Sequence, residues 1–351
     1  MRSLPLITLY LTERCNSRCV SCDYWRHGRA DITAAAIAEL LPELERLGTK
    51  VVLVSGGEPL IHPHWAEIAE TLRAGGLELW LLTSGLSLVK HAARAAALFQ
   101  SITVSLDGID RAMYAAIRGL DAFDNVCDGI RAAAATSMHV GVRVTVQRRN
   151  YRQLSAFVEL ARRCGASEIS FLAADVSNRQ AFGRSGADID GAGSQIALLP
   201  QDLPLFAEAL DSLERDNALD FESGFIAETP SKMRRLWQYF AALSGLGPFP
   251  PTRCNAPAFS AVIEAGGRVN PCFFIQGPTT RARLGPALDA PAMLQLREDI
   301  RAGRRAECLT CVCSMWREPD DLSGLTANAV SAALRRHRRP GGDGAGAPHG
   351  G

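Results

Sequence analysis

The sequence predicts an α/β fold in which helices cover a parallel β-sheet. Short apolar or β-branched runs alternate with amphipathic stretches of helical length between residues 6 and 172, and this alternation is typical of repeated βα units. The connections between the segments are short, as they are where each helix packs back onto a parallel sheet. Polar or glycine-containing residues follow the first four runs, where parallel α/β folds usually place their functional groups.

Six strands and five intervening helices are expected in this region. The strands are predicted at residues 6–11, 50–54, 77–82, 101–106, 139–146 and 168–172. The helices between them are predicted at residues 32–47, 63–74, 88–99, 114–135 and 154–164. Residues 175–193 are polar and rich in glycine, which indicates a loop or a domain boundary. Two further helices are expected at residues 203–213 and 231–243, before a break of glycines and prolines at 245–251.

The composition is that of an ordinary globular protein. The chain has 351 residues, of which 47% are hydrophobic and 21% charged, and this length suggests about two domains. No apolar run is long enough to span a membrane, and Leu4 to Leu11 is short for a signal sequence. A net charge of +1 argues against attraction to a membrane surface or to nucleic acid. We therefore expect a cytoplasmic protein.

The ten cysteines are distributed unevenly. Eight of them lie in two groups, one near each end of the chain, and this clustering favours metal ligands over disulfides. Cys127 and Cys164 stand alone in helix-like segments and are expected to pack as small core residues.

The first group is Cys15, Cys19 and Cys22, in a C-x3-C-x2-C run that follows the first predicted strand. Three thiolates at this spacing could bind three irons of a [4Fe–4S] cube and leave the fourth iron open to another ligand. Structural zinc is the alternative, although zinc sites are normally closed by four Cys or His ligands.

This motif resembles the signature of the radical S-adenosylmethionine (radical SAM) enzymes. The resemblance covers about residues 5–175 and implies a partial (β/α)6 TIM-like barrel in which Cys15, Cys19 and Cys22 bind a catalytic [4Fe–4S] cluster. In such enzymes SAM binds the open iron and is cleaved by one electron to a 5′-deoxyadenosyl radical, which abstracts hydrogen from the substrate. One position departs from the family, because the usual aromatic or bulky residue before the third cysteine is Ser21 here.

A second motif, Gly56-Gly57-Glu58-Pro59, follows the second predicted strand. On its own such a run is most often a turn, although its glycines let the backbone approach a ligand closely. The run matches the GGEP motif of the radical SAM family. This match implies that Gly56, Gly57, Glu58 and Pro59 help to seat the amino group of SAM.

Polar residues of the next three strands complete the expected cofactor site. The Thr-Ser-Gly run after the third strand resembles the Thr-Asn-Gly of the family, with Ser84 in place of asparagine. Ser105 and Asp107 resemble the polar pair after the fourth strand and are expected near the ribose or methionine of SAM; a simple strand-end turn is the alternative. Arg143 alternates with valines on the fifth strand. It either binds the SAM carboxylate or a substrate anion, or points outward to solvent.

The second cysteine group is Cys254, Cys272, Cys308, Cys311 and Cys313. A β-hairpin is expected at residues 261–270, between the first two. The spacing from the first of these cysteines through a glycine to the second resembles the SPASM and Twitch extensions of radical SAM enzymes. The resemblance implies one auxiliary [4Fe–4S] cluster on the first four, with Cys313 as the alternative fourth ligand or a free thiol. Zinc is the alternative metal.

Four parts of the chain are predicted. They are a radical SAM partial barrel at residues 1–195, a helical connection at 196–250, a small Twitch/SPASM-like auxiliary cluster domain at 251–325, and a basic helix end with a disordered glycine-rich tail at 326–351.

The resemblance implies an enzyme that oxidises, rearranges or forms a bond in its substrate. It also implies an electron donor of the flavodoxin or ferredoxin type. No peptide-recognition domain precedes the barrel, which favours a natural-product or cofactor intermediate as substrate over the alternative, a ribosomal peptide. A non-catalytic iron–sulfur or zinc protein, serving in electron transfer or as a scaffold, is the alternative of another class.

Overall fold

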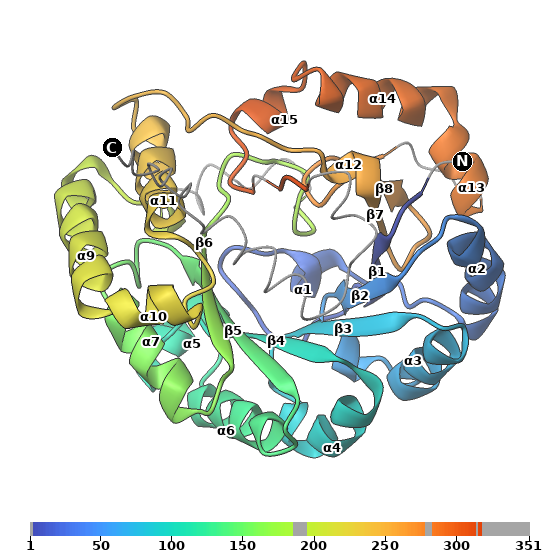
Figure 1. The fold of residues 1–351 in the computed structure, drawn as a ribbon, viewed down its shortest axis with the longest axis horizontal. Helices are drawn as coiled ribbons and strands as arrows, with labels where there is room; N and C mark the ends of the chain where they lie inside the picture. Colours follow the sequence, from blue (N-terminus) through green and yellow to red (C-terminus); the bar gives the residue numbers. More distant parts are fainter. Residues whose placement is uncertain (1–2, 185–194, 278–282, 314, 318–351) are drawn as a thin grey trace, which may run out of the picture.

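The centre of the molecule is an open, curved β-sheet. The computed structural model describes residues 3–184, 195–277, 283–313 and 315–317. In this part of the chain eight strands form one sheet in the order β6-β5-β4-β3-β2-β1-β7-β8. All neighbouring strands are parallel except β7 and β8, which are antiparallel. The strands β1 to β6 form an arc with helices on its outer side, which is a partial (β/α)6 barrel (Figure 1).

The barrel is built from alternating strands and helices. Its strands are β1 Leu6–Thr12, β2 Val51–Gly56, β3 Glu78–Thr83, β4 Ser101–Ser105, β5 His139–Val146 and β6 Glu168–Ala173. Its outer helices are α2 Ala34–Arg46, α3 Trp65–Ala74, α4 Leu88–Leu98, α5 Arg111–Arg118, α6 Phe123–Ala134 and α7 Leu154–Arg163. Two short helices, α1 Tyr24–His27 and the 3-10 helix η1 Pro59–Ile61, lie in the loops after β1 and β2.

The remaining elements follow β6. They are the 3-10 helix η2 Pro200–Asp202, the helices α9 Leu203–Asp216, α10 Ala218–Ser223, α11 Pro230–Leu243 and α12 Ala256–Phe259, the strands β7 Ser260–Ile263 and β8 Val269–Asn270, and the helices α13 Leu284–Asp289, α14 Pro291–Arg301 and α15 Ala306–Leu309.

The two faces of the sheet meet different surroundings. The four valines of β5 are fully buried in the main core against the helices, whereas Arg143 and Thr145 alternate with them and are partly exposed on the inner face. Period-two alternation of this kind separates a helix-covered face from an open one. Near the N-terminal ends of β1 to β3 an apolar cluster covers the inner face, where Leu6 and Trp80 pack with Phe259 of α12. Polar side chains therefore line the inner face nearer to the C-terminal ends of the strands.

Both edges of the six-stranded arc are paired. β7 runs parallel to β1, with Leu6 opposite Ser260, and turns back as β8 through Gly267, which has a left-handed φ of 86°. At the other edge Ile169 of β6 forms a parallel bridge with Ile226. The hairpin expected at residues 261–270 is therefore confirmed, and it extends the barrel sheet.

The α/β fold class and the six parallel strands are confirmed. The helical stretch expected at residues 114–135 consists of two helices, α5 and α6. The chain turns between them at Gly119, whose φ is 75° and where a Cβ atom would lie 2.3 Å from the carbonyl oxygen of Arg18. Helices α10 and α13 to α15 were not predicted. The division into four parts stays a prediction, and residues 326–351 lie outside the described residues.

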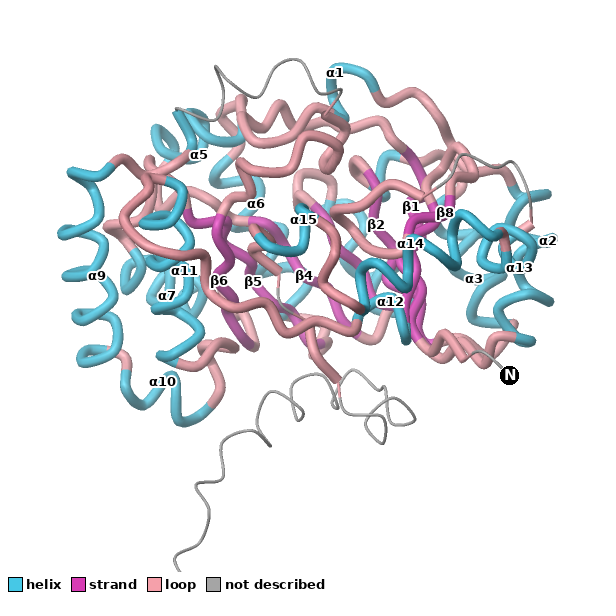
Figure 2. Tube along the Cα trace, turned by 90° about the horizontal axis from the view of Figure 1, so that it is seen from above, coloured by secondary structure: helices cyan, strands magenta, loops and turns pink. Residues whose placement is uncertain are grey.

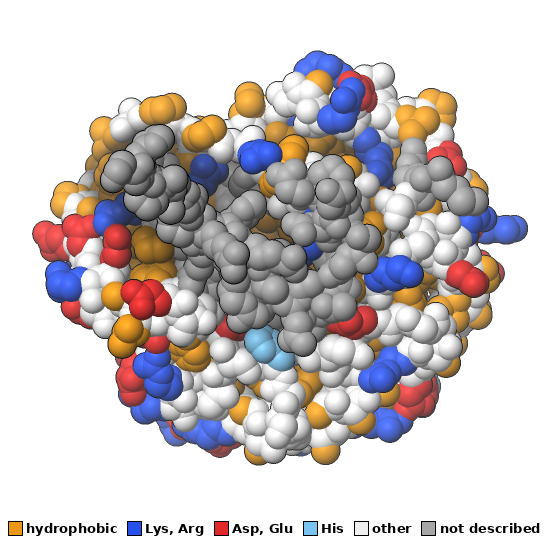
Figure 3. Space-filling model, in the orientation of Figure 1, with side chains coloured by type: hydrophobic (Ala, Val, Ile, Leu, Met, Phe, Trp, Pro, Cys, Tyr) orange, Lys and Arg blue, Asp and Glu red, His pale blue; other side chains and the backbone are white. Residues whose placement is uncertain are grey.

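Two expectations concern the core and the surface. Cys127 and Cys164 are both buried in the main core, as predicted. No helix among the described residues is long and apolar enough to cross a bilayer. On the face shown in Figure 3, acidic and basic side chains are interspersed around the rim, which agrees with the net charge of +1.

Candidate functional site

The loops after β1, β2, β3 and β4 meet at the C-terminal end of the sheet, where α1 and α5 also lie (Figure 2). Hydrogen bonds join each loop to a neighbour. The Gly57 N–H donates to the carbonyl oxygen of Thr12 at 2.7 Å, and the Ser84 N–H donates to Glu58 at 2.6 Å. The predicted motifs of separate strands are thus brought together at one site.

The loop with Cys15, Cys19 and Cys22 is held by the end of α5. The N–H groups of Arg18 and Val20 donate to the carbonyl oxygens of Arg118 and Ile117 at 2.9 and 3.0 Å. The last carbonyls of a helix have no partner inside the helix, so the cysteine loop supplies these partners. All three cysteines are partly buried. Because α5 ends before Gly119, its last carbonyl groups are free to hold the cysteine loop in place.

The two glycines after β2 press on the start of the same loop. A Cβ atom on Gly57 would lie 2.1 Å from the carbonyl oxygen of Arg14, and one on Gly56 would lie 2.2 Å from that of Thr12. The φ of Gly56 is 132°, which side-chain-bearing residues rarely adopt. Both glycines are therefore required by backbone contact with the cysteine loop, in addition to any contact with a ligand.

Replacing Gly57 by alanine is expected to displace the cysteine loop, because backbone atoms of Arg14 stand where the methyl group would lie. We expect iron affinity after anaerobic reconstitution to fall by about 10-fold or more, as for other losses of support around metal ligands. Gly76→Ala is the matched control, since its φ is 80° but nothing lies within 4 Å of the added atom. Equal iron retention in the two variants, measured by competition with a chelator, would contradict this role.

Glu58 is buried and its carboxylate is occupied by protein donors. It accepts hydrogen bonds from the Leu60 N–H at 3.1 Å, the Thr83 hydroxyl at 2.7 Å and the Ser84 N–H at 2.6 Å. Its side chain is 0% exposed. A carboxylate has about four acceptor positions, so little capacity is left for a ligand. In this structure Glu58 joins the loops after β2 and β3 and begins η1, while Pro59 is the first residue of η1.

Asp107 is likewise buried and paired. Its carboxylate accepts from the Thr145 N–H at 2.7 Å and forms an ion pair with Arg118 at 3.1 Å. Burial raises the pKa of the Asp107 carboxyl, and Arg118 opposes this shift. The ion pair fixes the end of α5 against β5. Arg118 was not predicted from the sequence, because an arginine at the end of a helix is usually a solvated residue.

Ser84, Ser105 and Arg143 belong to the same region; Ser84 is buried, whereas Ser105 and Arg143 are partly exposed. The Ser84 hydroxyl donates to Asn16 in the cysteine loop at 3.4 Å. Ser105 pairs in register with Arg143, whose Nε donates to the Ser170 hydroxyl at 3.2 Å. Arg143 lies on the inner face and is only partly exposed, so the outward-pointing alternative for this residue is wrong.

The surroundings of the first three cysteines fit an anionic metal cluster. Burial raises the pKa of the Cys15 thiol to about 11 and of the Cys22 thiol to about 12, and the Arg118 guanidinium opposes both shifts. The Nε of Arg118 and the hydroxyl of Ser17 are buried without a hydrogen-bond partner among the described residues. A cation that binds the thiols must displace their protons, and unpaired donors of this kind suit the sulfides of a cluster.

The second cysteine group is also brought together. The pKa of the Cys272 thiol is raised to about 12 by burial, and Cys254 and Cys308 add to this. Burial also raises the pKa of Cys311, with further contributions from Cys313, Cys272 and Cys254. These mutual charge effects mean that the five cysteines lie close to one another.

Two cations influence the pKa of the Cys313 thiol. Burial and Cys254 raise the pKa of its thiol, whereas Lys232 of α11 and Arg143 of β5 lower it. Its N–H donates to the Cys311 sulfur at 3.3 Å, and the Cys311 thiol donates to the Cys313 carbonyl oxygen at 3.0 Å. The second group therefore adjoins the inner face of the barrel at β5.

Neither group forms a preformed site for a single metal ion. Within the described ranges, no three or more His, Cys, Asp or Glu side chains are placed to hold one ion. Thiolates around one zinc lie within about 4 Å of each other, because each Zn–S bond is about 2.3 Å long. In a four-iron cube each thiolate binds a different iron, so the thiolates stand farther apart.

Part of this chain resembles one known protein family and several known proteins. Residues 9–161 match the model of the radical SAM superfamily. The chain is 31% identical over 228 residues to a pre-heme d1 synthase of Dinoroseobacter shibae, covering 63% of this chain and 55% of that protein. It is 37% identical over 174 residues to a GTP 3′,8-cyclase of Mycobacterium marinum, covering 46% of this chain and 48% of that protein. It is 31% identical over 166 residues to the mycofactocin maturase MftC of Mycobacterium tuberculosis, covering 46% of this chain and 42% of that protein.

The chain thus spans about half the length of these curated relatives. Solved structures resemble more of it. A histidine-tagged anSMEcpe with bound AdoMet superposes with a TM-score of 0.62 at 15% identity, covering 95% of this chain and 99% of that one. SuiB of Streptococcus suis bound to S-adenosylmethionine gives a TM-score of 0.61 at 13% identity, covering 92% of this chain and 75% of that one. At these identities the likeness concerns the fold.

Proposed function

We propose that this chain, whose residues 9–161 match the model of the radical SAM superfamily, is an enzyme that cleaves SAM reductively and abstracts hydrogen from a substrate. The observation that supports this most is the cysteine loop at the C-terminal end of the parallel sheet. There Cys15, Cys19 and Cys22 lie beside the unpaired donors of Ser17 and Arg118. A loop of this shape offers three thiolates to a cube that needs four ligands.

The protein residues hold and orient the cofactors. When bound, the [4Fe–4S] cluster supplies the electron that converts SAM to a 5′-deoxyadenosyl radical. Cys15, Cys19 and Cys22 would bind three of its irons, and Arg118 would place a positive charge beside these thiolates. A nearby positive charge stabilises the anionic form of a ligand group.

The residues after β2 to β5 form the SAM site in this proposal. Gly56 and Gly57 let the backbone after β2 pack closely against the cysteine loop. Ser84, Ser105 and Arg143 offer polar groups at or after three strands. Glu58 and Asp107 contribute through the loops that they fix, since their carboxylates already accept hydrogen bonds from the protein. Pro59 begins η1 and so directs the chain away from this site.

An auxiliary [4Fe–4S] cluster at the second cysteine group completes the proposal. Cys254, Cys272, Cys308 and Cys311 are its proposed ligands, with Cys313 as the alternative fourth ligand. Full ligation by four cysteines would leave no open iron, which suits electron transfer to or from a substrate radical. Arg143 and Lys232 face Cys313, so this cluster would adjoin the inner face of the barrel where a substrate could lie.

The substrate is proposed to be a natural-product or cofactor intermediate. Two of the similar proteins are named for small molecules, a pre-heme d1 synthase and a GTP 3′,8-cyclase. A peptide substrate is the second candidate, because solved structures of SuiB and anSMEcpe with similar folds are titled as peptide complexes. A flavodoxin or ferredoxin as electron donor, and a cytoplasmic location, belong to the same proposal.

Anaerobic reconstitution with iron and sulfide, followed by dithionite and SAM, tests the enzymatic function. Two cubes predict about eight irons per chain, and radical chemistry predicts 5′-deoxyadenosine that depends on dithionite. Mass spectrometry of the nucleosides and a colorimetric iron assay measure both. About four irons without 5′-deoxyadenosine, or zinc in place of iron, would contradict the enzyme and favour an electron-transfer or scaffold protein.

A further inference from the structure

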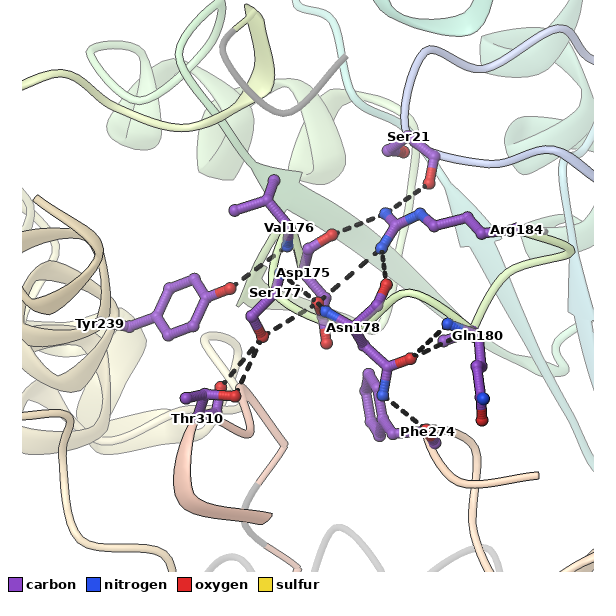
Figure 4. A network of polar contacts seen from close by, with 11 residues as sticks. Ser21, Asp175, Val176, Ser177, Asn178, Gln180, Arg184, Tyr239, Phe274 and Thr310 are labelled. Carbon is purple, nitrogen blue, oxygen red and sulfur yellow. Dashed lines mark hydrogen bonds and ion pairs between the residues drawn. The ribbon is translucent and has the colours of Figure 1, made fainter. Parts of the chain in front are cut away.

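The loop after β6 contacts both cysteine groups. We call residues Asp175 to Arg184 the bridging loop. It lies between the first cysteine loop, represented by Ser21, and the C-terminal segments that contain Phe274 and Thr310 (Figure 4). These partners are far apart in the sequence but meet on one short loop.

On one side the bridging loop holds the residues around Cys22. The carbonyl oxygen of Phe182 accepts from the Asp23 N–H at 2.8 Å and from the Cys22 thiol at 3.5 Å. The Nη2 of Arg184 donates to the carbonyl oxygen of Ser21 at 3.0 Å. Three consecutive residues of the first cysteine loop are therefore bound by two residues of the bridging loop.

On the other side the same loop holds the second cysteine group. The Asn178 amide donates to the carbonyl oxygen of Phe274 at 2.5 Å, two residues after Cys272. The Thr310 hydroxyl, next to Cys311, donates to the Ser177 hydroxyl at 3.2 Å. The rings of Phe182 and Phe274 also pack edge to face, with centroids 5.8 Å apart.

One buried arginine keeps the bridging loop in this shape. Arg184 donates to the carbonyl oxygens of Asp175 at 2.6 Å and Asn178 at 2.8 Å, in addition to Ser21. Its guanidinium also lies 3.8 Å from the Asp175 carboxylate, and the two side chains are 8% and 2% exposed. Donors in a planar guanidinium are fixed relative to one another. The position of Ser21 is therefore tied to that of Asn178, and through Asn178 to Phe274.

The backbone at Phe182 is strained. Its φ is 58°, in the left-handed region, which is unfavourable for a residue with a side chain. Such a conformation persists only where the surrounding contacts over-determine it. Its carbonyl and its ring both have partners, one on each cysteine group, which is the kind of constraint that retains strain.

We propose that Arg184 is a positioning residue that fixes both cysteine groups through the bridging loop, so that each site holds its metal cluster in a geometry set partly by the other. This inference rests on the proposed function, since it needs two clusters. Arg184 itself touches neither group of thiols in the contacts described, so it acts through Ser21 and Asn178. A residue that supports two ligand sets at once should influence both, although it lies outside both sequence motifs.

The test measures each cluster separately. Cys254→Ala/Cys272→Ala leaves only the first site, and Cys15→Ala/Cys19→Ala/Cys22→Ala leaves only the second. Arg184→Met is introduced into each background, and the loss of iron to a ferrous chelator is followed under anaerobic conditions. We expect iron loss to become roughly 10- to 100-fold faster in both backgrounds. Electron paramagnetic resonance of the reduced first cluster, with and without SAM, should show an altered line shape.

Controls separate positioning from general damage. Arg149→Met, at an exposed position, should change neither rate. Arg184→Lys keeps the charge beside Asp175 but has fewer fixed donors, so it should give intermediate rates. If the circular dichroism spectrum shows that the Arg184→Met protein is unfolded, Asn178→Ala is used in its place. Iron loss is then expected to become faster in both backgrounds, as for Arg184→Met.

A change in one background only, or in neither, would overturn the coupling. If neither parent background binds an iron–sulfur cluster, the proposed function itself fails, which is a different result.

Discussion

Replacing Cys15, Cys19 and Cys22 together by alanine should abolish the formation of 5′-deoxyadenosine. The three thiols are the ligands proposed for the SAM-cleaving cluster, and without them no electron can reach SAM. Bound iron should fall from about eight to about four per chain, because the second cysteine group lies on other segments. The measurement is iron content together with 5′-deoxyadenosine after reduction with dithionite.

Two variants serve as controls for the triple substitution. Cys127→Ala removes a buried core cysteine that lies in neither group and should leave iron and product formation close to those of the unaltered protein. Cys254→Ala/Cys272→Ala should also lose about four irons but should still form 5′-deoxyadenosine in the absence of substrate. Product formation by the triple variant would show that the cleavage site lies elsewhere.

Glu58→Ala should destabilise the barrel and weaken SAM binding together. The substitution leaves the Leu60 and Ser84 N–H groups and the Thr83 hydroxyl without their buried acceptor. Each unsatisfied buried donor costs about 1–3 kcal/mol, so we expect the free energy of unfolding to fall by about 3 kcal/mol or more. Urea denaturation of the metal-free chain measures this loss, and equilibrium dialysis of the reconstituted protein measures SAM affinity.

The matched control for this effect is Glu39→Ala. Glu39 is an exposed residue of α2, and its replacement should change stability by no more than about 0.5 kcal/mol. Glu58→Gln should be intermediate, because an amide keeps one acceptor oxygen but presents N–H groups to donors. A Glu58→Ala protein of unchanged stability that has lost only SAM binding would favour direct contact with the amino group of SAM.

The fold could be predicted because it depends on local patterns. The valines of β5 alternate with polar residues, and such runs, separated by amphipathic helices, specify a parallel sheet whatever surrounds them. The break between α5 and α6 could not be found in this way. It depends on Gly119 lying against the backbone of Arg18, and residue 18 belongs to a loop about 100 positions earlier.

The candidate site shows the same division. The cysteines and the Gly56–Pro59 run were found because their spacing is itself a motif. Arg118 and Arg184 were not, since each looks like an ordinary surface arginine in the sequence and becomes a buried pairing group only in the fold. The burial of the Glu58 and Asp107 carboxylates could not be foreseen either, because their donors come from other strands and loops.

The pairing of β7 with β1, and of Ile226 with β6, has a consequence for solubility. An open barrel has two edge strands, and each presents unpaired N–H and C=O groups to which another chain can add. Here β7 pairs along β1, and Ile226 bridges one residue of β6, so fewer of these groups are left for intermolecular strand addition. Removal of Ser260 and the residues after it would therefore leave the backbone groups of β1 that pair with β7 open to another chain.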